Sequence, residues 1–248
     1  MPLERSAWTR FWCRRAGVYS LDNRGYLADP LHQWGRITNP AAITFDGISA
    51  VPCLVLSGEP GAGKSDSISN TIEGIRRAEP RDHISGVIKI DLIGYQSDIR
   101  LHRAIFESSV SNEWRSTGKP LHLFLDGVDE CTLGPSVLQS VLEEGFSGSS
   151  LENLYLRLAC RTADWPQSLE DWLWTRWGKE QMQVHELLPL RRRDVAEVAK
   201  ANGVTPERFL AAVEDADVVP LAIKPITLTF LLSSFRAEGR LPSTQKEL

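Results

Sequence analysis

A glycine-rich stretch between an apolar run and a helical pattern constrains this chain more than any other feature. The stretch is Gly58-Glu59-Pro60-Gly61-Ala62-Gly63-Lys64-Ser65, which fits the pattern G-x-x-x-x-G-K-[ST]. Before it, the apolar run 51–57 predicts a buried strand. After it, isoleucines at positions 68, 72 and 75 recur at helical spacing. The sequence therefore predicts a strand, a tight loop and a helix in direct succession.

The residue types of this loop suit the binding of a phosphate chain. Glycines allow backbone angles and close approaches that a side chain would block, so backbone N–H groups can point at phosphate oxygens. The following helix adds the positive end of its dipole. Lys64 is expected to reach the β- and γ-phosphates, and the Ser65 hydroxyl to bind Mg²⁺. We therefore predict a nucleotide site at 58–65, with a surface glycine turn as the alternative.

Composition and charge limit the class of protein. The chain has 248 residues, of which 42% are hydrophobic and 24% charged, as in ordinary soluble proteins of one or two domains. A net charge of −4 disfavours nucleic acid as a partner. We expect no membrane partner, because no apolar run approaches spanning length. The four scattered cysteines form no C-x-x-C pair, and no signal peptide is visible, which indicates a reducing, cytoplasmic location.

Strands and helices alternate from residue 51 onward. Four further apolar runs predict strands at 84–90, 121–125, 154–160 and 181–187. Between them lie two helical patterns, one of which places Ile99, Phe106, Val110 and Trp114 on one face of a single helix. Such strand–helix units predict an α/β fold: a three-layer P-loop NTPase sandwich with a five-stranded, mostly parallel sheet. Sites in such sheets lie beyond the carboxyl ends of the strands.

We expect three regions along the chain. Residues 1–50 read as an irregular lead-in whose aromatic residues, Trp8, Phe11, Trp12 and Trp34, pack on a core. Residues 51–190 form the P-loop nucleotide-binding domain, and 191–248 a small helical subdomain. In that subdomain Thr205-Pro206 predicts a helix start, and the basic run 191–193 predicts a solvated helix face. Because the last residues complete no core, we expect a piece of a longer protein.

A cluster of carboxylates at the end of an apolar strand is the second strong signal. Residues 121–125 are followed by Asp126-Gly127-Val128-Asp129-Glu130. We expect this strand to lie beside the loop strand, with Asp126 holding Mg²⁺ through water opposite Ser65. Asp129 and Glu130 are the candidates to orient or deprotonate an attacking water. The alternative is that these acids only cap the next helix.

A weaker signal is Arg161, which follows the apolar run 154–160. A cation at the carboxyl end of a strand can sense a γ-phosphate and stabilise transition-state charge. A surface arginine at a strand–loop junction is the alternative.

Together these motifs resemble the NACHT family of STAND-type signalling NTPases. Asp-Gly-x-Asp-Glu is that family's form of the acidic motif, whereas most related ATPases place a glutamate where Gly127 stands. The segment 158–162 resembles the family's sensor arginine strand. The segment 224–228 resembles the proline segment that packs near adenine, which assigns Pro225 to the nucleotide pocket. The likeness spans roughly residues 51–235, and the segment 25–30 is similar to bacterial members.

The resemblance implies a molecular switch with ATP or ADP and Mg²⁺ as cofactors. In this family ADP holds a closed monomer, and exchange for ATP permits homo-oligomerisation of the whole protein and activation of an effector. Hydrolysis is expected to be slow, and bacterial relatives act in defence against phage.

Other functions stay open at this point. A motor ATPase of the AAA+ type, acting on nucleic acid or protein, shares the loop and the acidic strand, although Gly127 speaks against it. A P-loop kinase would need an acceptor pocket and a lid that we cannot place. A GTPase lacks its Asn-Lys-x-Asp segment here. A nucleotide-gated binding module without turnover is the last alternative.

Overall fold

The computed structural model describes residues 9–78 and 86–241, which belong to two compact units. The sheet unit comprises Phe45–Glu59 and Lys64–Glu186, and the helical unit comprises Met1–Thr44, Pro60–Gly63 and Leu187–Leu248. The apex of the glycine loop therefore belongs to the helical unit and its two ends to the sheet unit. The expected division at residues 50 and 190 remains a prediction.

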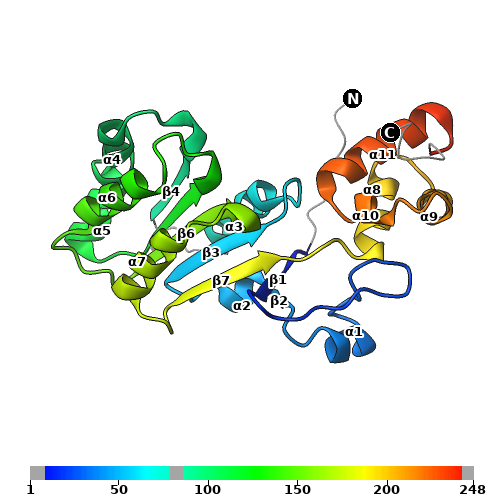
Figure 1. The fold of residues 1–248 in the computed structure, drawn as a ribbon, viewed down its shortest axis with the longest axis horizontal. Coiled ribbons are helices and arrows are strands. Elements are labelled where there is room, and N and C mark those ends of the chain that lie inside the picture. The colour runs from blue at the N-terminus through cyan, green and yellow to red at the C-terminus, as the bar shows by residue number, and fades with distance from the viewer. Residues whose placement is uncertain (1–8, 79–85, 242–248) are drawn as a thin grey trace. The chain divides into compact units, whose positions relative to one another are not determined.

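Five parallel strands form the sheet unit, and the predicted runs supply all of them (Figure 1). They pair in the order β7-β3-β6-β5-β4. Their bounds are β3 (Cys53–Gly58), β4 (Gly86–Asp91), β5 (Leu121–Asp126), β6 (Leu154–Arg161) and β7 (Met182–Leu187). Residues 84 and 85 of the predicted second strand lie outside the described residues. The α/β fold with a mostly parallel sheet is thus confirmed.

Among the described residues the sheet has seven strands, where we expected five. The two additional strands are β1 (Phe11–Arg14) and β2 (Ile43–Thr44), which pair antiparallel. The full order is β2-β1-β7-β3-β6-β5-β4. Both strands are short and lie among charged residues and glycines of the lead-in. No apolar run therefore predicted them.

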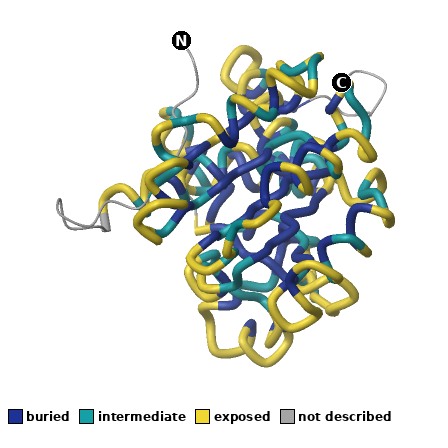
Figure 2. Tube along the Cα trace, turned by 90° about the vertical axis from the view of Figure 1, so that its left-hand side faces the viewer, coloured by how far each residue is buried: buried dark blue, intermediate teal, exposed yellow. Residues whose placement is uncertain are grey.

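The parallel strands are apolar because both of their faces are covered. All six residues of β3 are buried, and Leu54, Val55 and Leu56 have no exposed surface. Such continuous apolar runs are typical of parallel strands between helical layers. Buried stretches of the chain are dark blue in Figure 2.

The connections of the sheet unit are helical. The α-helices are α2 (Phe45–Ile48), α3 (Lys64–Ala78), α4 (Asp98–Phe106), α5 (Ser109–Thr117), α6 (Pro135–Phe146) and α7 (Gln167–Trp177), and the 3-10 turns are η1 (Leu92–Gly94), η2 (Val128–Glu130) and η3 (Thr162–Asp164). The single helix expected across residues 99–114 was wrong. Ser108 has extended backbone and its hydroxyl accepts a hydrogen bond from Ser111 N, so a new helix begins there. Ile99 is accordingly 60% exposed.

The helical unit combines the lead-in with the last quarter of the chain. Its helices are α1 (Gln33–Thr38), α8 (Arg192–Ala201), α9 (Pro206–Asp215), α10 (Val219–Ala222) and α11 (Pro225–Glu238). Thr205 is the N-cap of α9, as predicted. Tyr26 of the lead-in is fully buried in the same core as Leu228 and Leu232 of α11. The lead-in therefore contributes side chains to the core of this unit.

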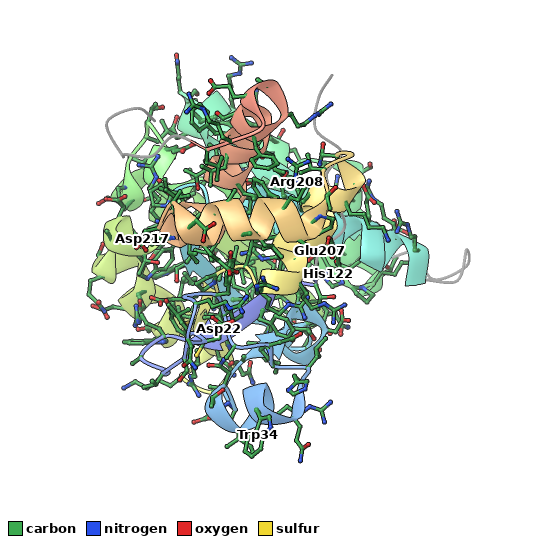
Figure 3. The ribbon with its side chains drawn as sticks, turned by 90° about the vertical axis from the view of Figure 1, so that its right-hand side faces the viewer. Asp22, Trp34, His122, Glu207, Arg208 and Asp217 are labelled. Carbon is green, nitrogen blue, oxygen red and sulfur yellow. The ribbon has the colours of Figure 1, made fainter. Side chains whose placement is uncertain are left out.

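The aromatic residues of the lead-in do not all pack as expected. Trp12 is fully buried and Phe11 is 4% exposed, but Trp34 is 69% exposed. Trp34 points away from α1 in Figure 3. Trp8 lies outside the described residues.

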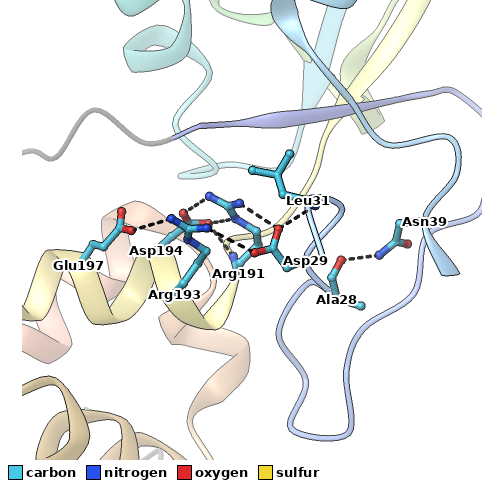
Figure 4. A network of polar contacts seen from close by, with 8 residues as sticks. All are labelled: Ala28, Asp29, Leu31, Asn39, Arg191, Arg193, Asp194 and Glu197. Atoms are coloured by element: carbon cyan, nitrogen blue, oxygen red, sulfur yellow. Dashed lines mark hydrogen bonds and ion pairs between the residues drawn. The ribbon is translucent and has the colours of Figure 1, made fainter. Parts of the chain in front are cut away.

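The basic run also departs from expectation, since Arg191 is buried rather than solvated. Its side chain is 3% exposed and pairs with Asp194 at 2.6 Å and with Asp29 at 3.0 Å (Figure 4). Arg192 and Arg193 are more exposed and pair with acidic side chains. The pattern of charges could not reveal Asp29, which lies 162 positions away.

Candidate functional site

The glycine loop has the predicted local structure. Strand β3 ends at Gly58 and α3 begins at Lys64, with Ser65 as its second residue. Gly61 and Gly63 have φ angles of +73° and +89°, in the region that favours glycine. The loop therefore needs glycine at both positions to turn from the strand into the helix.

Lys64 is folded back over the first residues of its own loop. Its Nζ donates hydrogen bonds to Gly58 O at 2.6 Å and Glu59 O at 3.2 Å. Burial lowers the pKa of Lys64, and the nearby carboxylate of Asp129 raises it in part. The amine thus lies at the sheet edge where the acidic residues lie.

The acidic residues follow β5 directly. Asp126 is the last residue of the strand, and its Oδ2 lies 3.9 Å from Lys89 Nζ. Asp129 and Glu130 belong to η2, which begins after Gly127 in a left-handed conformation. The Asp129 side chain is only 7% exposed, whereas that of Glu130 is 44% exposed.

Arg161 contacts both candidate water-positioning acids. Its backbone N–H donates to Asp129 Oδ1 at 3.0 Å, and its Nε lies 3.0 Å from Asp129 Oδ2. Its Nη2 lies 3.3 Å from Glu130 Oε1. Burial, with a contribution from Asp129, raises the pKa of the neighbouring Cys160 thiol to about 12, which keeps that thiol neutral.

The acidic strand does not lie beside the loop strand, and that expectation was wrong. Strand β6 separates them, pairing with β3 on one side and β5 on the other. Gly58 is in register with Arg161. The carboxyl ends of three neighbouring parallel strands therefore bring the loop lysine, the acidic cluster and the arginine to one edge, as such sheets favour.

The loop apex packs within the helical unit. A Cβ on Gly61 would lie 2.2 Å from Ile226 Cγ2, and one on Gly63 would lie 3.2 Å from Pro225 Cγ. Pro225 is buried at the start of α11. The structure thus places Pro225 against the loop, while its predicted position near adenine remains a prediction. Sequence reasoning missed Arg10, whose Nη1 donates to Ala62 O, because an isolated arginine in a lead-in carries no distinguishing pattern.

The oxygen ligands predicted for a metal fit Mg²⁺. Within residues 9–78 and 86–241, no group of three or more His, Cys, Asp or Glu side chains could hold a metal ion. Ser65 and Asp126 offer a hydroxyl and a carboxylate, and Mg²⁺ commonly keeps several waters and binds one or two carboxylates plus substrate phosphates. Separately, none of the helices in the described part of the chain has the length and apolar character to cross a bilayer.

Comparisons with known proteins give a fold but no family. No family model matches the chain, and no curated protein matches its sequence. Among solved structures, the chain is similar to the Saccharomyces cerevisiae Hsp104–ADP complex, with a TM-score of 0.51 and 20% identity over 75% of this chain and 28% of that one.

Two further structures match less well. They are Cdc6p from Pyrobaculum aerophilum (TM-score 0.49, 13% identity, 79% of this chain and 60% of that one) and a point variant of RuvB from Thermotoga maritima (TM-score 0.48, 13% identity, 80% and 62%). The chain spans less than two thirds of each matched chain.

Sheet topology, the strand–loop–helix element and the likeness to Hsp104 together define the fold. This chain has the α/β fold of a P-loop NTPase.

Proposed function

We propose that this chain is the ATP- and ADP-binding module of a NACHT-like STAND signalling protein, in which bound nucleotide acts as a molecular switch. One observation carries the proposal: Lys64, Asp126, Asp129 and Arg161 gather at the strand edge where the glycine loop begins and ends. A loop of that pattern beside paired carboxylates and an arginine suits a nucleoside triphosphate with its metal.

Each residue of the site has a role in this proposal. The backbone amides of the loop residues 58–63 bind phosphate oxygens, and Lys64 neutralises their charge. Ser65 and Asp126 hold Mg²⁺, largely through water. When bound, Mg²⁺ neutralises charge on the β- and γ-phosphates. Pro225 packs near the adenine.

In our proposal hydrolysis at this site is slow because Arg161 already pairs with both acids that could activate water. Asp129 accepts from Arg161 through both carboxylate oxygens, and Glu130 also contacts Arg161. A carboxylate already paired with a cation is a weaker base for water. Arg161 must turn from these acids toward a γ-phosphate before either acid can orient water.

The wider role follows from the resemblance and belongs to the proposal. The whole protein is a cytoplasmic homo-oligomer in its active state, with a function in bacterial defence against phage. Within it, residues 51–190 form the nucleotide-binding domain and 191–248 a small helical subdomain.

The Lys64→Ala variant tests the nucleotide site. We expect the unchanged protein to bind ADP and ATP in titration calorimetry, and the variant to bind both at least about 10-fold more weakly, because a charged contact to phosphate is lost. Lys200→Ala, on the exposed face of α8, is the control and should bind normally. Equal affinity of the Lys64→Ala protein would show that the site is misassigned.

A motor ATPase that acts on nucleic acid or protein is the second candidate, because it would use the same P-loop NTPase fold. The two functions differ in turnover. A switch co-purifies with ADP and turns over slowly with or without added macromolecules. Rapid steady hydrolysis that single-stranded DNA or an unfolded protein stimulates would favour the motor.

A further inference from the structure

Arg10 of the lead-in reaches the apex of the glycine loop. It precedes β1, is only 9% exposed, and belongs to the same unit as residues Pro60–Gly63. Its Nη1 donates to Ala62 O at 2.8 Å and its Nη2 donates to Leu188 O at 2.8 Å. One buried guanidinium thus joins the loop to the chain that leaves β7.

The position of Arg10 is itself fixed by the neighbouring backbone. Leu188 N donates to Phe11 O at 2.9 Å, so the residue after Arg10 is hydrogen-bonded to the segment that Arg10 also contacts. A guanidinium presents donors in a rigid fork, which suits two carbonyls at separate places in the chain. A lysine at this position could not reproduce both contacts with that geometry.

Hydrogen bonds to the carbonyls of the apex also orient its amides. Every described peptide bond is trans, and in a planar trans peptide the N–H points opposite to the C=O. Arg10 holds the carbonyl of the Ala62–Gly63 peptide, and so sets the direction of Gly63 N–H. Ile226 N donates to Gly61 O at 3.4 Å and sets the direction of Ala62 N–H in the same way.

We propose that Arg10 is a positioning residue for phosphate binding, acting by presetting the amide of Gly63. Two contacts of its guanidinium are made to backbone carbonyls, so it acts through the loop and does not itself need to touch a phosphate. The start of α11 packs at the same place, because Pro225 Cγ and Arg10 Nη1 both lie 3.2 Å from the position of a Gly63 Cβ. The inference rests on the proposed nucleotide site.

The test compares three variants by calorimetry with ADP and with adenosine. Arg10→Met should weaken ADP binding by about 10- to 100-fold, since a charge-assisted hydrogen bond to the loop is lost. Its affinity for adenosine, which lacks the phosphates, should stay nearly unchanged. Arg10→Lys keeps the charge and should lie between. Phe209→Leu, in the core of the same unit, is the control that lowers thermal stability without changing the ratio of the two affinities.

A second measurement needs no nucleotide. The ¹⁵N–¹H signals of Ala62 and Gly63 should move in Arg10→Met and Arg10→Lys relative to the unchanged protein, and should not move in Phe209→Leu. If Arg10→Met fails to fold, Arg10→Lys decides both measurements.

The outcomes separate this inference from the proposed function. Normal ADP affinity in folded Arg10→Met, or an equal loss of ADP and adenosine binding, would overturn the positioning role. If the unchanged protein binds neither ADP nor ATP, the proposed function fails. In that case unmoved Ala62 and Gly63 signals in the Arg10 variants would still overturn the inference on its own.

Discussion

Asp129 is the carboxylate on which the contacts of the site converge. It accepts from Arg161 through both oxygens, raises the pKa of Cys160, and raises that of Lys64. Its low exposure distinguishes it from Glu130, which is open to solvent. Asp129 is therefore the better placed of the two acids to hold a fixed geometry, and Glu130 the freer to move.

Asp129→Asn should separate nucleotide binding from hydrolysis. The amide keeps the shape of the carboxylate but cannot act as a base or form an ion pair with Arg161. We expect hydrolysis in a single turnover to fall by about 100-fold, the usual size of a general-base contribution, with ADP affinity nearly unchanged. Asp164→Asn, an exposed acid three positions after Arg161, should behave as the unchanged protein. Normal hydrolysis by Asp129→Asn would move the role to Glu130.

Tyr26 should make the helical unit sensitive to alkaline pH. Burial raises the pKa of this phenol from 10.0 to about 12, and Glu214 adds to the effect. Because Tyr26 ionises at lower pH in the unfolded chain, rising pH favours unfolding. The contribution of Tyr26 to the free energy of unfolding is fully present below pH 10 and is lost between about pH 10 and 12. At pH 11 the loss is about 1.4 kcal/mol, one pH unit above the ordinary pKa.

Tyr26→Phe removes this ionisation, so comparing the variant with the unchanged protein separates the effect of Tyr26 from that of other titrating groups. Urea unfolding at pH 9 and pH 11 should show a smaller loss of stability for the variant than for the unchanged protein. The same pH dependence in both proteins would contradict the assignment. A direct check is the absorbance of tyrosinate, in which one tyrosine of the folded protein should titrate late.

Helices α4 and α6 pack closely because one of them lacks a side chain. A Cβ on Gly145 of α6 would lie 2.0 Å from Phe106 Cε2 of α4. The Phe106 ring in turn meets Phe146 edge-on, with centroids 5.1 Å apart. A Cβ on Gly74 of α3, in contrast, would meet no described atom within 4 Å apart from its chain neighbours and the backbone of its own helix.

These two helical glycines predict opposite effects of the same substitution. Gly145→Ala should lower the free energy of unfolding by about 1–3 kcal/mol, because the added methyl group overpacks the contact with Phe106. Gly74→Ala should raise it by about 0.5–1 kcal/mol, the helix preference of alanine over glycine. Urea denaturation of the two variants measures both. A stabilising Gly145→Ala would show that α4 and α6 are not packed as described.

Buried ion pairs of Arg191 connect the lead-in to the rest of the helical unit. Arg191 pairs with Asp194 of its own turn and with Asp29 of the lead-in (Figure 4). Its guanidinium also lies over the ring of Phe11, 5.0 Å from the ring centroid. Asp29 and Phe11 lie far from Arg191 in the sequence. A cluster of this kind joins distant parts of the chain into one unit.

Arg191→Met should therefore destabilise the helical unit strongly. Removing one partner leaves the carboxylate of Asp194 buried and unpaired, at a cost of about 3–5 kcal/mol. Arg193→Met, an exposed position on the same helix, should cost less than about 1 kcal/mol. Thermal unfolding of the two variants compares them. Similar midpoints would mean that Arg191 is hydrated in solution and that the cluster does not hold the lead-in.

Patterns among neighbouring residues were enough to predict most of the helices and strands and the centre of the candidate site. The strand–loop–helix at Gly58–Ser65 follows from glycine geometry and hydrophobic burial over neighbouring residues. The five parallel strands were visible for the same reason, since strands buried on both faces are apolar runs. The break between α4 and α5 also has a local cause in the sequence, because Ser108 is the N-cap of α5 and could have been recognised as one.

Long-range pairing determined the rest. Strand order, with β6 between the loop strand and the acidic strand, depends on which backbones hydrogen-bond across the sheet, and a strand's own residues do not record its neighbours. Arg10 and Arg191 look like any charged residues of a lead-in or a helix start. The carbonyl partners of Arg10 lie 52 and 178 positions away, and Asp29, one of the two carboxylate partners of Arg191, lies 162 positions away. Residue type sets what a side chain can bind, and folding alone sets which group it meets.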